Sequence, residues 1–357
     1  MKPTEKLHAA GQSLWLDNIT RDLLTSGILE RYIADLSVTG LTSNPTIFDK
    51  AIESTSAYDA AIRASGKEGE KLFFELAIDD LRQAANLFRP IWERTKGTDG
   101  WVSLEVSPLL AYNADSTIEE AARLHADGDR PNLFIKIPGT PEGLGAIEEA
   151  VLAGVPVNVT LLFSREQYLA AADAYIKGIE RRVEAGLDPA VGSVASVFVS
   201  RWDVAVQGQP DELHNRLGIA IAKRTYRAYR ELLDSPRWQR LANEGARAQR
   251  LLWASTGTKD PDASDVLYVR ALAAPFTVNT MPENTLLAFG DHGEVTEFLP
   301  ADGGNAEETI AGFAEAGVDV DALALRLQKE GAESFDESWN QLLRCIAEKS
   351  EALATAH

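Results

Sequence analysis

The chain has 357 residues, of which 45% are hydrophobic, and 54 acidic against 35 basic side chains give a formal net charge of −19. A nucleic-acid surface needs a basic patch, so this balance argues against nucleic-acid binding and requires a local cationic pocket for any anionic substrate. No apolar run approaches the roughly 18 residues of a membrane span, and the opening Met-Lys-Pro-Thr-Glu lacks a signal-peptide core, which together predict a cytoplasmic protein without membrane contacts.

Eight short apolar runs, rich in β-branched residues and bounded by turn residues, predict eight strands. The runs are Ser13–Asn18, Val38–Asn44, Trp101–Val106, Asn132–Pro138, Pro156–Phe163, Ser193–Ser200, Arg250–Thr256 and Phe276–Met281. Segments with helical periodicity fill most of the gaps, at Arg21–Leu36, Glu68–Trp92, Thr117–His125, Leu144–Ala153, Ser164–Ala185, His214–Leu233 and Asp262–Ala273. Strands that alternate with helices indicate crossover connections and a parallel sheet.

Eight such units favour a closed (β/α)₈ TIM barrel over about residues 13–290. The alternative is an open doubly wound sheet, but no Gly-x-Gly-x-x-Gly follows the first predicted strand. We expect an extra N-terminal helix or cap before the barrel and C-terminal helices at Asn305–Ala316, Asp319–Glu330 and Glu333–Leu353. Because three short helices make a thin core, residues 303–357 are predicted to pack on the barrel, so that residues 1–357 form one domain.

The fourth predicted strand, Asn132-Leu-Phe-Ile-Lys-Ile-Pro-Gly139, contains a lysine within an apolar run. A lysine is rarely buried unless another group compensates its charge. Alternate side chains of a strand share a face, so Phe134 and Lys136 point to one side and the aliphatic residues between them to the other. Lys136 therefore needs a specific explanation.

Other polar side chains share a pleat phase near the C-terminal ends of the predicted strands. They are Asp17, Thr42, Asn44, Glu105, Asn158, Thr160 and Ser196, with Arg201 directly after the sixth strand. In a parallel barrel one phase faces the helices and the other the interior, and catalytic residues collect at the C-terminal rim. We therefore expect these side chains to converge on one site with Lys136.

Several of these residues also have a purely structural interpretation. A lone carboxylate at a strand end is more often a helix cap or a salt-bridge partner than a catalyst. Asn44 precedes a proline and fits a turn, Thr160 fits a β-branched strand former, and Ser196 fits a small residue in a crowded interior.

Lys136 itself fits a structural ion pair with Glu105 or Asp17. That interpretation needs one partner, whereas many hydroxyl, amide and carboxylate groups face the same interior. A buried lysine with two carboxylates, an Asn and a Thr suits carbonyl chemistry through a Schiff base, because burial in general lowers a lysine pKa by up to roughly 3–5 units from about 10.4. One carboxylate can then take a hydroxyl proton while the other positions a water.

Metal chemistry has little support in the sequence. The single cysteine, Cys345, excludes an internal disulfide and a cysteine-based zinc site, and the five histidines show no paired spacing. We predict no metal and no cofactor, and we interpret Cys345 as a small core residue of an amphipathic helix.

Six stretches of the chain resemble transaldolase, the Schiff-base-forming, class I enzyme family of the pentose phosphate pathway. They are Ser13-Leu-Trp-Leu-Asp-Asn, Thr39-Gly-Leu-Thr-Ser-Asn-Pro-Thr-Ile-Phe, Val102-Ser-Leu-Glu-Val-Ser-Pro, Leu133-Phe-Ile-Lys-Ile-Pro-Gly-Thr, Pro156-Val-Asn-Val-Thr-Leu-Leu-Phe-Ser and Thr277-Val-Asn-Thr-Met-Pro. The resemblance implies a transferase that moves a dihydroxyacetone unit from sedoheptulose 7-phosphate or fructose 6-phosphate to glyceraldehyde 3-phosphate or erythrose 4-phosphate. Its partners would be small-molecule sugar phosphates, and a homodimer is an option that the sequence leaves open.

The same resemblance implies roles for individual residues. Lys136 would form the Schiff base, Asp17 would be the acid/base at the hydroxyl whose deprotonation breaks the carbon–carbon bond, and Glu105 would work with Thr160 through a water. The dihydroxyacetone moiety would be held by Asn44, Asn158 and Ser196.

The phosphate site implied by the resemblance includes Arg201 and Ser255. Many family members place an arginine just after that serine, whereas this chain reads Ala254-Ser-Thr-Gly-Thr-Lys259. Lys259 and backbone N–H groups are the predicted substitute, and a lysine would bind phosphate as a point charge instead of bidentately.

Two other functions stay open at this point. A fructose-6-phosphate aldolase would share the barrel and the lysine but release free dihydroxyacetone, and Glu105 and the extra segments argue against it. A non-catalytic sugar-phosphate-binding barrel would keep the pocket without needing a reactive lysine.

Overall fold

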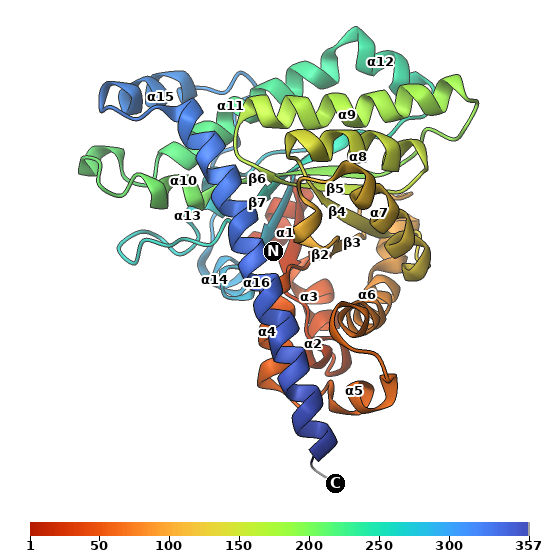
Figure 1. The fold of residues 1–357 in the computed structure, drawn as a ribbon. Helices are drawn as coiled ribbons and strands as arrows, with labels where there is room; N and C mark the ends of the chain where they lie inside the picture. The colour runs from red at the N-terminus through yellow and green to blue at the C-terminus, as the bar shows by residue number, and fades with distance from the viewer. Residues whose placement is uncertain (356–357) are drawn as a thin grey trace.

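The computed structural model describes residues 1–355 and shows eight parallel strands that close into a barrel in chain order (Figure 1). The strands are β1 Ser13–Asp17, β2 Val38–Thr42, β3 Val102–Glu105, β4 Leu133–Pro138, β5 Val157–Leu162, β6 Ser193–Phe198, β7 Gln249–Ala254 and β8 Val278–Met281. Each lies within its predicted run, except that β7 begins one residue earlier. The predicted TIM barrel is confirmed, and the open doubly wound sheet is excluded because β1 pairs with both β2 and β8.

Helices surround this barrel and extend beyond it at both ends of the chain. In chain order they are α1 Pro3–Ala9, α2 Arg21–Thr25, α3 Ile28–Leu36, α4 Pro45–Ser54, α5 Asp59–Ser65, α6 Gly69–Arg94, α7 Ala114–Gly128, α8 Pro141–Leu152, α9 Arg165–Glu184, α10 Ser200–Ala205, α11 Leu217–Asp234, α12 Pro236–Asn243, α13 Leu267–Ala271, α14 Glu283–His292, α15 Ala306–Glu315 and α16 Val320–Thr355. Two 3₁₀ turns, η1 Pro108–Leu110 and η2 Asp211–Leu213, complete the set. The predicted extra N-terminal helix is α1.

Side-chain caps start several helices close to the C-terminal ends of the strands. Asn44, Asn113, Thr140 and Ser164 each accept a hydrogen bond from a backbone N–H in the first turn of α4, α7, α8 and α9. Such caps satisfy N–H groups that have no partner within a helix. The chain therefore turns from strand to helix within a few residues after β2, β4 and β5, whereas the 3₁₀ turn η1 separates β3 from α7.

Several predicted helix limits were wrong. The segment Arg21–Leu36 is two helices, because Gly27 adopts a left-handed conformation with φ of 80° between them. The segment Asp262–Ala273 contains only the five-residue α13. The sequence prediction also missed α4, α5, α10, α12 and α14, which have ten residues or fewer.

The prediction of two separate helices at the C-terminal end was wrong. Asp319–Glu330 and Glu333–Leu353 are one 36-residue helix, α16, instead of two. Gly331 does not break the helix. A Cβ there would lie 2.9 Å from Cδ2 of Leu161 and 3.3 Å from Nη1 of Arg201, so the glycine lets the helix backbone lie directly against the barrel rim.

Large aromatic side chains fill the N-terminal half of the barrel interior. Trp15, Trp101 and Phe134 are buried together, and the rings of Trp101 and Phe134 stack with centroids 4.1 Å apart. Phe134 shares the inward phase of β4 with Lys136, as predicted. The interior beneath Lys136 is therefore packed with aromatic rings, and the polar side chains occupy the layer above them.

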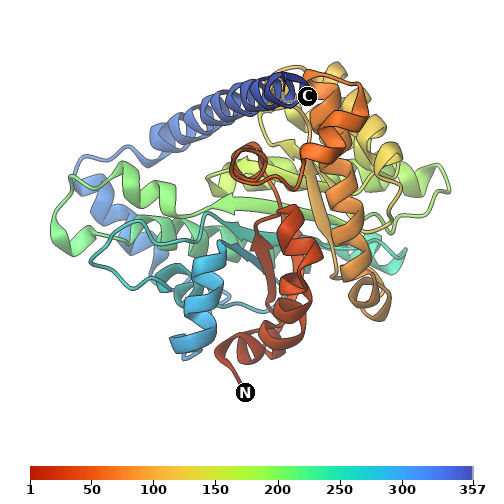
Figure 2. The same cartoon turned by 90° about the horizontal axis from the view of Figure 1, so that it is seen from below.

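Helix α16 crosses the C-terminal end of the barrel, and Figure 2 shows it on the side opposite the N-terminus. Gln328 holds it there, because its side-chain amide donates to the carbonyl oxygens of Gly139 (3.0 Å) and Leu161 (2.9 Å) at the ends of β4 and β5. Further along, the Thr46 hydroxyl donates to Ser338 at 2.9 Å. Among residues 1–355 there is no helix with the length and apolar character needed to cross a membrane.

The buried amide of Gln328 predicts a measurable effect on stability. Replacing Gln328 by Leu keeps the side-chain size but leaves two buried carbonyl oxygens unpaired, and we expect the free energy of unfolding to fall by about 1–3 kcal/mol. Denaturant titration measures this change. Lys329→Met is the matched control, because Lys329 is the next residue of α16, is largely exposed and, within residues 1–355, makes only a long surface ion pair with Glu333. An equal fall in the free energy of unfolding in the two variants would contradict the stabilising role of the Gln328 amide.

Candidate active site

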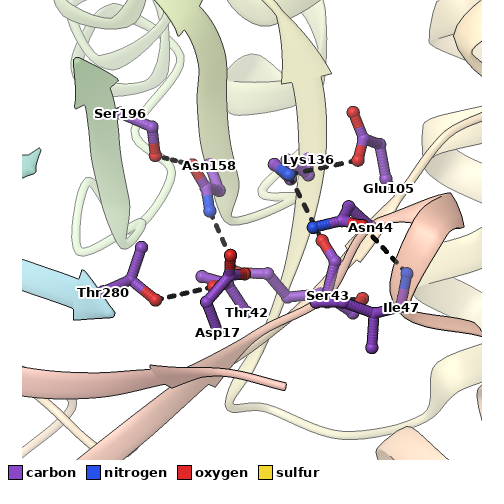
Figure 3. A network of polar contacts seen from close by, with 11 residues as sticks. Asp17, Thr42, Ser43, Asn44, Ile47, Glu105, Lys136, Asn158, Ser196 and Thr280 are labelled. Carbon is purple, nitrogen blue, oxygen red and sulfur yellow. Dashed lines mark hydrogen bonds and ion pairs between the residues drawn. The ribbon is translucent and has the colours of Figure 1, made fainter. Parts of the chain in front are cut away.

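Lys136 lies within the barrel near its C-terminal rim. The residue is 6% exposed, and its Nζ donates to Oε2 of Glu105 at 3.1 Å and to the backbone carbonyl of Ser43 at 3.2 Å (Figure 3). The ring of Phe335, from α16, lies 5.4 Å from Nζ and covers it from above. The lysine is thus held by one carboxylate, one carbonyl and one aromatic face.

Glu105 is buried on the neighbouring strand β3, in register with Lys136. Burial raises the pKa of its carboxyl, and the charge and hydrogen bond of Lys136 oppose that rise. Its second oxygen, Oε1, has no hydrogen-bond partner within residues 1–355, and neither has the buried hydroxyl of Thr160 on β5. Buried polar atoms are normally satisfied, so these two oxygens are suited to hold a water or a substrate group.

Asp17 ends β1 and faces the same cavity as Lys136. Although part of its surface is accessible, it is enclosed by protein atoms, and this desolvation raises its pKa, while Lys136 and the Thr42 hydrogen bond lower it. The Thr42 hydroxyl donates to Oδ1 of Asp17 at 2.7 Å. Because its single hydrogen is used there, the Thr280 hydroxyl, whose oxygen lies 2.6 Å from that of Thr42, donates to the Thr42 oxygen. This chain of hydroxyls orients the carboxylate.

Asn158 and Ser196 form a second hydrogen-bonded chain. The Ser196 hydroxyl donates to Oδ1 of Asn158 at 2.7 Å, and Nδ2 of Asn158 donates to the Ser103 hydroxyl at 3.1 Å (Figure 3). The orientation of the fully buried Asn158 amide is thereby defined. Sequence reasoning missed Ser103, although its position two residues before Glu105 placed it in the inward phase of the same strand.

Asn44 serves the fold as well as the cavity. Its Oδ1 accepts a hydrogen bond from the backbone N–H of Ile47 at 3.1 Å and caps α4, so Asn44 has a structural role as a helix cap where the structural interpretation expected a turn residue. The residue also lines the cavity beside Lys136. Because the cap occupies the carbonyl oxygen, the amide nitrogen is the group that can donate to a ligand.

A cavity of about 160 Å³ brings the predicted residues together. Eight of the ten line it, namely Asp17, Asn44, Lys136, Thr160, Ser196, Arg201, Ser255 and Lys259. The other two, Glu105 and Asn158, contact it through their bonds to Lys136 and Ser196. Thr280, Phe198 and Phe335 also line the cavity and were not predicted. The sequence signal for Thr280 is the stretch Thr277-Val-Asn-Thr-Met-Pro, whereas Phe335 lies far along the chain from the predicted strands.

Arg201 is the main cation at the outer end of the cavity. It lies on the short helix α10, with its guanidinium carbon 5.3 Å from the ring centre of Phe198 and 5.9 Å from that of Phe335. Burial lowers the pKa of Arg201, but an arginine remains charged in a protein. Ser255 shares a 2.8 Å hydrogen bond with Ser200 beside it. A charged, partly desolvated guanidinium next to hydroxyl groups suits an anion such as phosphate.

The residues described, 1–355, contain no group of three or more His, Cys, Asp and Glu side chains arranged to hold a metal ion. The arrangement can perform amine chemistry instead. A lysine, two carboxylates in different environments and oriented amide and hydroxyl groups surround one small cavity, which is the equipment for forming an imine and moving protons around it.

Comparison with known proteins gives consistent results over nearly the whole chain. The profile of the family described as Transaldolase/Fructose-6-phosphate aldolase matches residues 14–346. A transaldolase of Frankia alni is 45% identical over 360 residues, covering 97% of each chain, and one of Thiobacillus denitrificans is 44% identical, covering 97% of this chain and all of its own. A protein of Nostoc punctiforme named Transaldolase 2 is 39% identical over 96% of each chain.

The hydroxyl chain to Asp17 generates a prediction about its pKa. Thr42→Val removes the hydrogen bond that stabilises the charged carboxylate, so the pKa of Asp17 should rise further. The ¹³C resonance of the Asp17 carboxyl, assigned with Asp17→Asn, should then titrate at higher pH than in the unaltered protein. Thr46→Val is the control, since the Thr46 hydroxyl donates to Ser338 and not to Asp17. An unchanged midpoint in Thr42→Val would refute the assignment of this hydrogen bond.

Proposed function

The chain belongs to the transaldolase/fructose-6-phosphate aldolase family, and from that membership we propose the steps and the residues by which it transfers a dihydroxyacetone unit. It is an enzyme of the transferase class that works through a lysine Schiff base. Sedoheptulose 7-phosphate and fructose 6-phosphate are the proposed donors, and glyceraldehyde 3-phosphate and erythrose 4-phosphate the proposed acceptors. The observation that carries the residue assignment is Lys136, buried between Glu105 and the oriented groups of Asn158 and Ser196.

The first step joins Lys136 to the ketone carbon of the donor. The unprotonated amine attacks that carbon, a C–N bond forms, and the carbonyl oxygen leaves as water after taking up protons. Glu105 is the proposed proton donor and acceptor, acting through a water held with Thr160. The unpaired Oε1 of Glu105 and the unpaired hydroxyl of Thr160 support this role, because each has a free position for such a water.

The second step breaks the carbon–carbon bond. Asp17 takes the proton from the hydroxyl next to the bond, the electron pair of the bond moves into the iminium on Lys136, and the aldose phosphate leaves. The acceptor aldehyde then adds in the reverse sense, and water releases the new ketose. The raised pKa of Asp17 supports this assignment, because a base whose pKa lies closer to the working pH transfers protons in both directions more readily.

The dihydroxyacetone part and the phosphate are assigned to different groups. Asn44, Asn158 and Ser196 are proposed to bind the dihydroxyacetone hydroxyls. The phosphate would lie at the other end of the cavity, against Arg201, Ser255 and Lys259. We also propose that the enzyme works in the cytoplasm, and a homodimer is the proposed assembly to test by sedimentation.

Borohydride trapping tests the role of Lys136. After incubation with fructose 6-phosphate, reduction should leave a three-carbon adduct on Lys136, located by mass mapping, because the enamine retains three carbons of the donor. Lys136→Met should lose both the adduct and all but a trace of the transfer activity, whereas Lys177→Met, which alters a surface lysine on α9, should retain both. An active protein with an unmodified Lys136 would overturn the mechanism.

The family description includes aldolases, so transfer must be distinguished from cleavage. With fructose 6-phosphate alone, we expect little free dihydroxyacetone, because the enamine stays bound to Lys136 in the closed cavity until an acceptor aldehyde reacts with it. Adding erythrose 4-phosphate should start turnover. A coupled assay for dihydroxyacetone measures the difference, and sustained release without an acceptor would identify an aldolase instead.

A further inference from the structure

A second hollow adjoins the Lys136 cavity and is partly built by the C-terminal helix. Its volume is about 630 Å³, and it shares Arg201, Ser255 and Lys259 with the cavity. Helix α16 adds Arg326 and Glu330 to its lining. The end of the active site proposed to bind phosphate therefore opens into this hollow, where α16 adds the guanidinium of Arg326 to that of Arg201.

The position of α16 over this hollow is fixed by contacts of residues near Arg326 and Glu330 in the same helix. Gln328 bonds two carbonyl oxygens at the strand ends, and Gly331 packs against the guanidinium of Arg201. Phe335, one turn later, lies over both Arg201 and Lys136. Leu327 and Gln328 lie on the side of α16 that meets the barrel, whereas Arg326 and Glu330, four residues apart, lie on a more exposed side of the helix and line the hollow.

The charges around the hollow suit a phosphate monoester. Three cations, Arg201, Lys259 and Arg326, face one carboxylate, Glu330, which leaves a formal excess of two positive charges in a chain of net charge −19. A phosphate monoester carries about 1.5–2 negative charges near pH 7. Nε of Arg326 and Oε1 of Glu330 are 3.5 Å apart and both side chains are more than half exposed, so this ion pair is weak and easily exchanged.

From these contacts we infer that Arg326 is a phosphate ligand of the active site, supplied by the C-terminal helix. The inference rests on the proposed function. It accounts for the sequence Ala254-Ser-Thr-Gly-Thr-Lys259, where an arginine after Ser255 is missing: the second guanidinium comes from α16. Arg326 exchanges Glu330 for the phosphate and donates two N–H groups to its oxygens, which a lysine cannot do with the same geometry.

Steady-state kinetics of Arg326→Met test the inference. The KM for fructose 6-phosphate should rise roughly 10- to 100-fold with a much smaller change in kcat, because a charged hydrogen-bond donor to the substrate is lost at a distance from the reacting carbons. Inorganic phosphate should become a correspondingly weaker competitive inhibitor. Arg344→Met is the matched control, since Arg344 is an exposed arginine of the same helix whose guanidinium bonds only to Gln341 among the residues described; its KM should be unchanged.

A second variant gives an effect of opposite sign. Glu330→Gln removes the competing carboxylate, so both phosphate inhibition and fructose 6-phosphate binding should become tighter by a few-fold. A merely structural Arg326–Glu330 pair would be lost equally in both variants and would give changes of the same sign. Unchanged KM and phosphate inhibition in Arg326→Met would overturn the inference.

Trapping with free dihydroxyacetone separates this inference from the function on which it rests. This ketone has no phosphate, so borohydride should attach it to Lys136 equally in the unaltered protein and in Arg326→Met. If no adduct forms even in the unaltered protein, the Schiff-base function fails. If the adduct forms in both proteins but Arg326→Met leaves phosphate binding intact, only the role of Arg326 fails.

Discussion

The buried ion pair between Lys136 and Glu105 is the constraint on which the rest of the site depends. Removing two charges from water costs several kcal/mol per ion, and their attraction offsets this cost only when other polar groups complete the shell. Here the Ser43 carbonyl takes a second hydrogen of the ammonium group, and the packed aromatic layer below excludes water. The second oxygen of Glu105 remains unpaired within residues 1–355, which leaves the pair open to a reactant on one side.

The same ion pair explains the arrangement of the barrel in layers. Trp101 and Phe134 fill the lower interior, and the oriented amide of Asn158 and carboxylate of Asp17 lie at the level of the lysine or above it. Above these, α16 completes the enclosure with the ring of Phe335. A desolvated site strengthens every electrostatic interaction within it, so the C-terminal helix contributes to the chemistry although it provides neither the lysine nor a carboxylate in contact with it.

Much of the barrel and of its inner residues could be predicted from sequence, because both follow from local periodicity. The pleat phase of β4 alone places Lys136 inside, and the same phase on β3 and β5 brings Glu105 and Asn158 beside it. The path of α16 could not be predicted in this way. Gly331 is unfavourable in a helix by local propensity, and only the closeness of Leu161 and Arg201 in the folded chain explains why a residue without a Cβ stands there. Length alone did not decide which helices could be predicted, because α14 was missed and α15, which also has ten residues, was predicted.

The segments that carry the site residues also suggest which of these residues can be replaced during evolution. Groups proposed for the dihydroxyacetone unit sit on strands or strand ends, where a shift of one residue would reverse their direction. Ser196 is hydrogen-bonded to Asn158, and Asn44 to the backbone N–H of Ile47. The residues proposed to bind the phosphate sit on three separate segments outside the strands, namely the loop after β7, the short α10 and α16. A missing arginine in one of these segments can therefore be replaced from another. Arg326 is such a replacement, because a phosphate requires charge and N–H donors within reach but does not specify the segment that carries them.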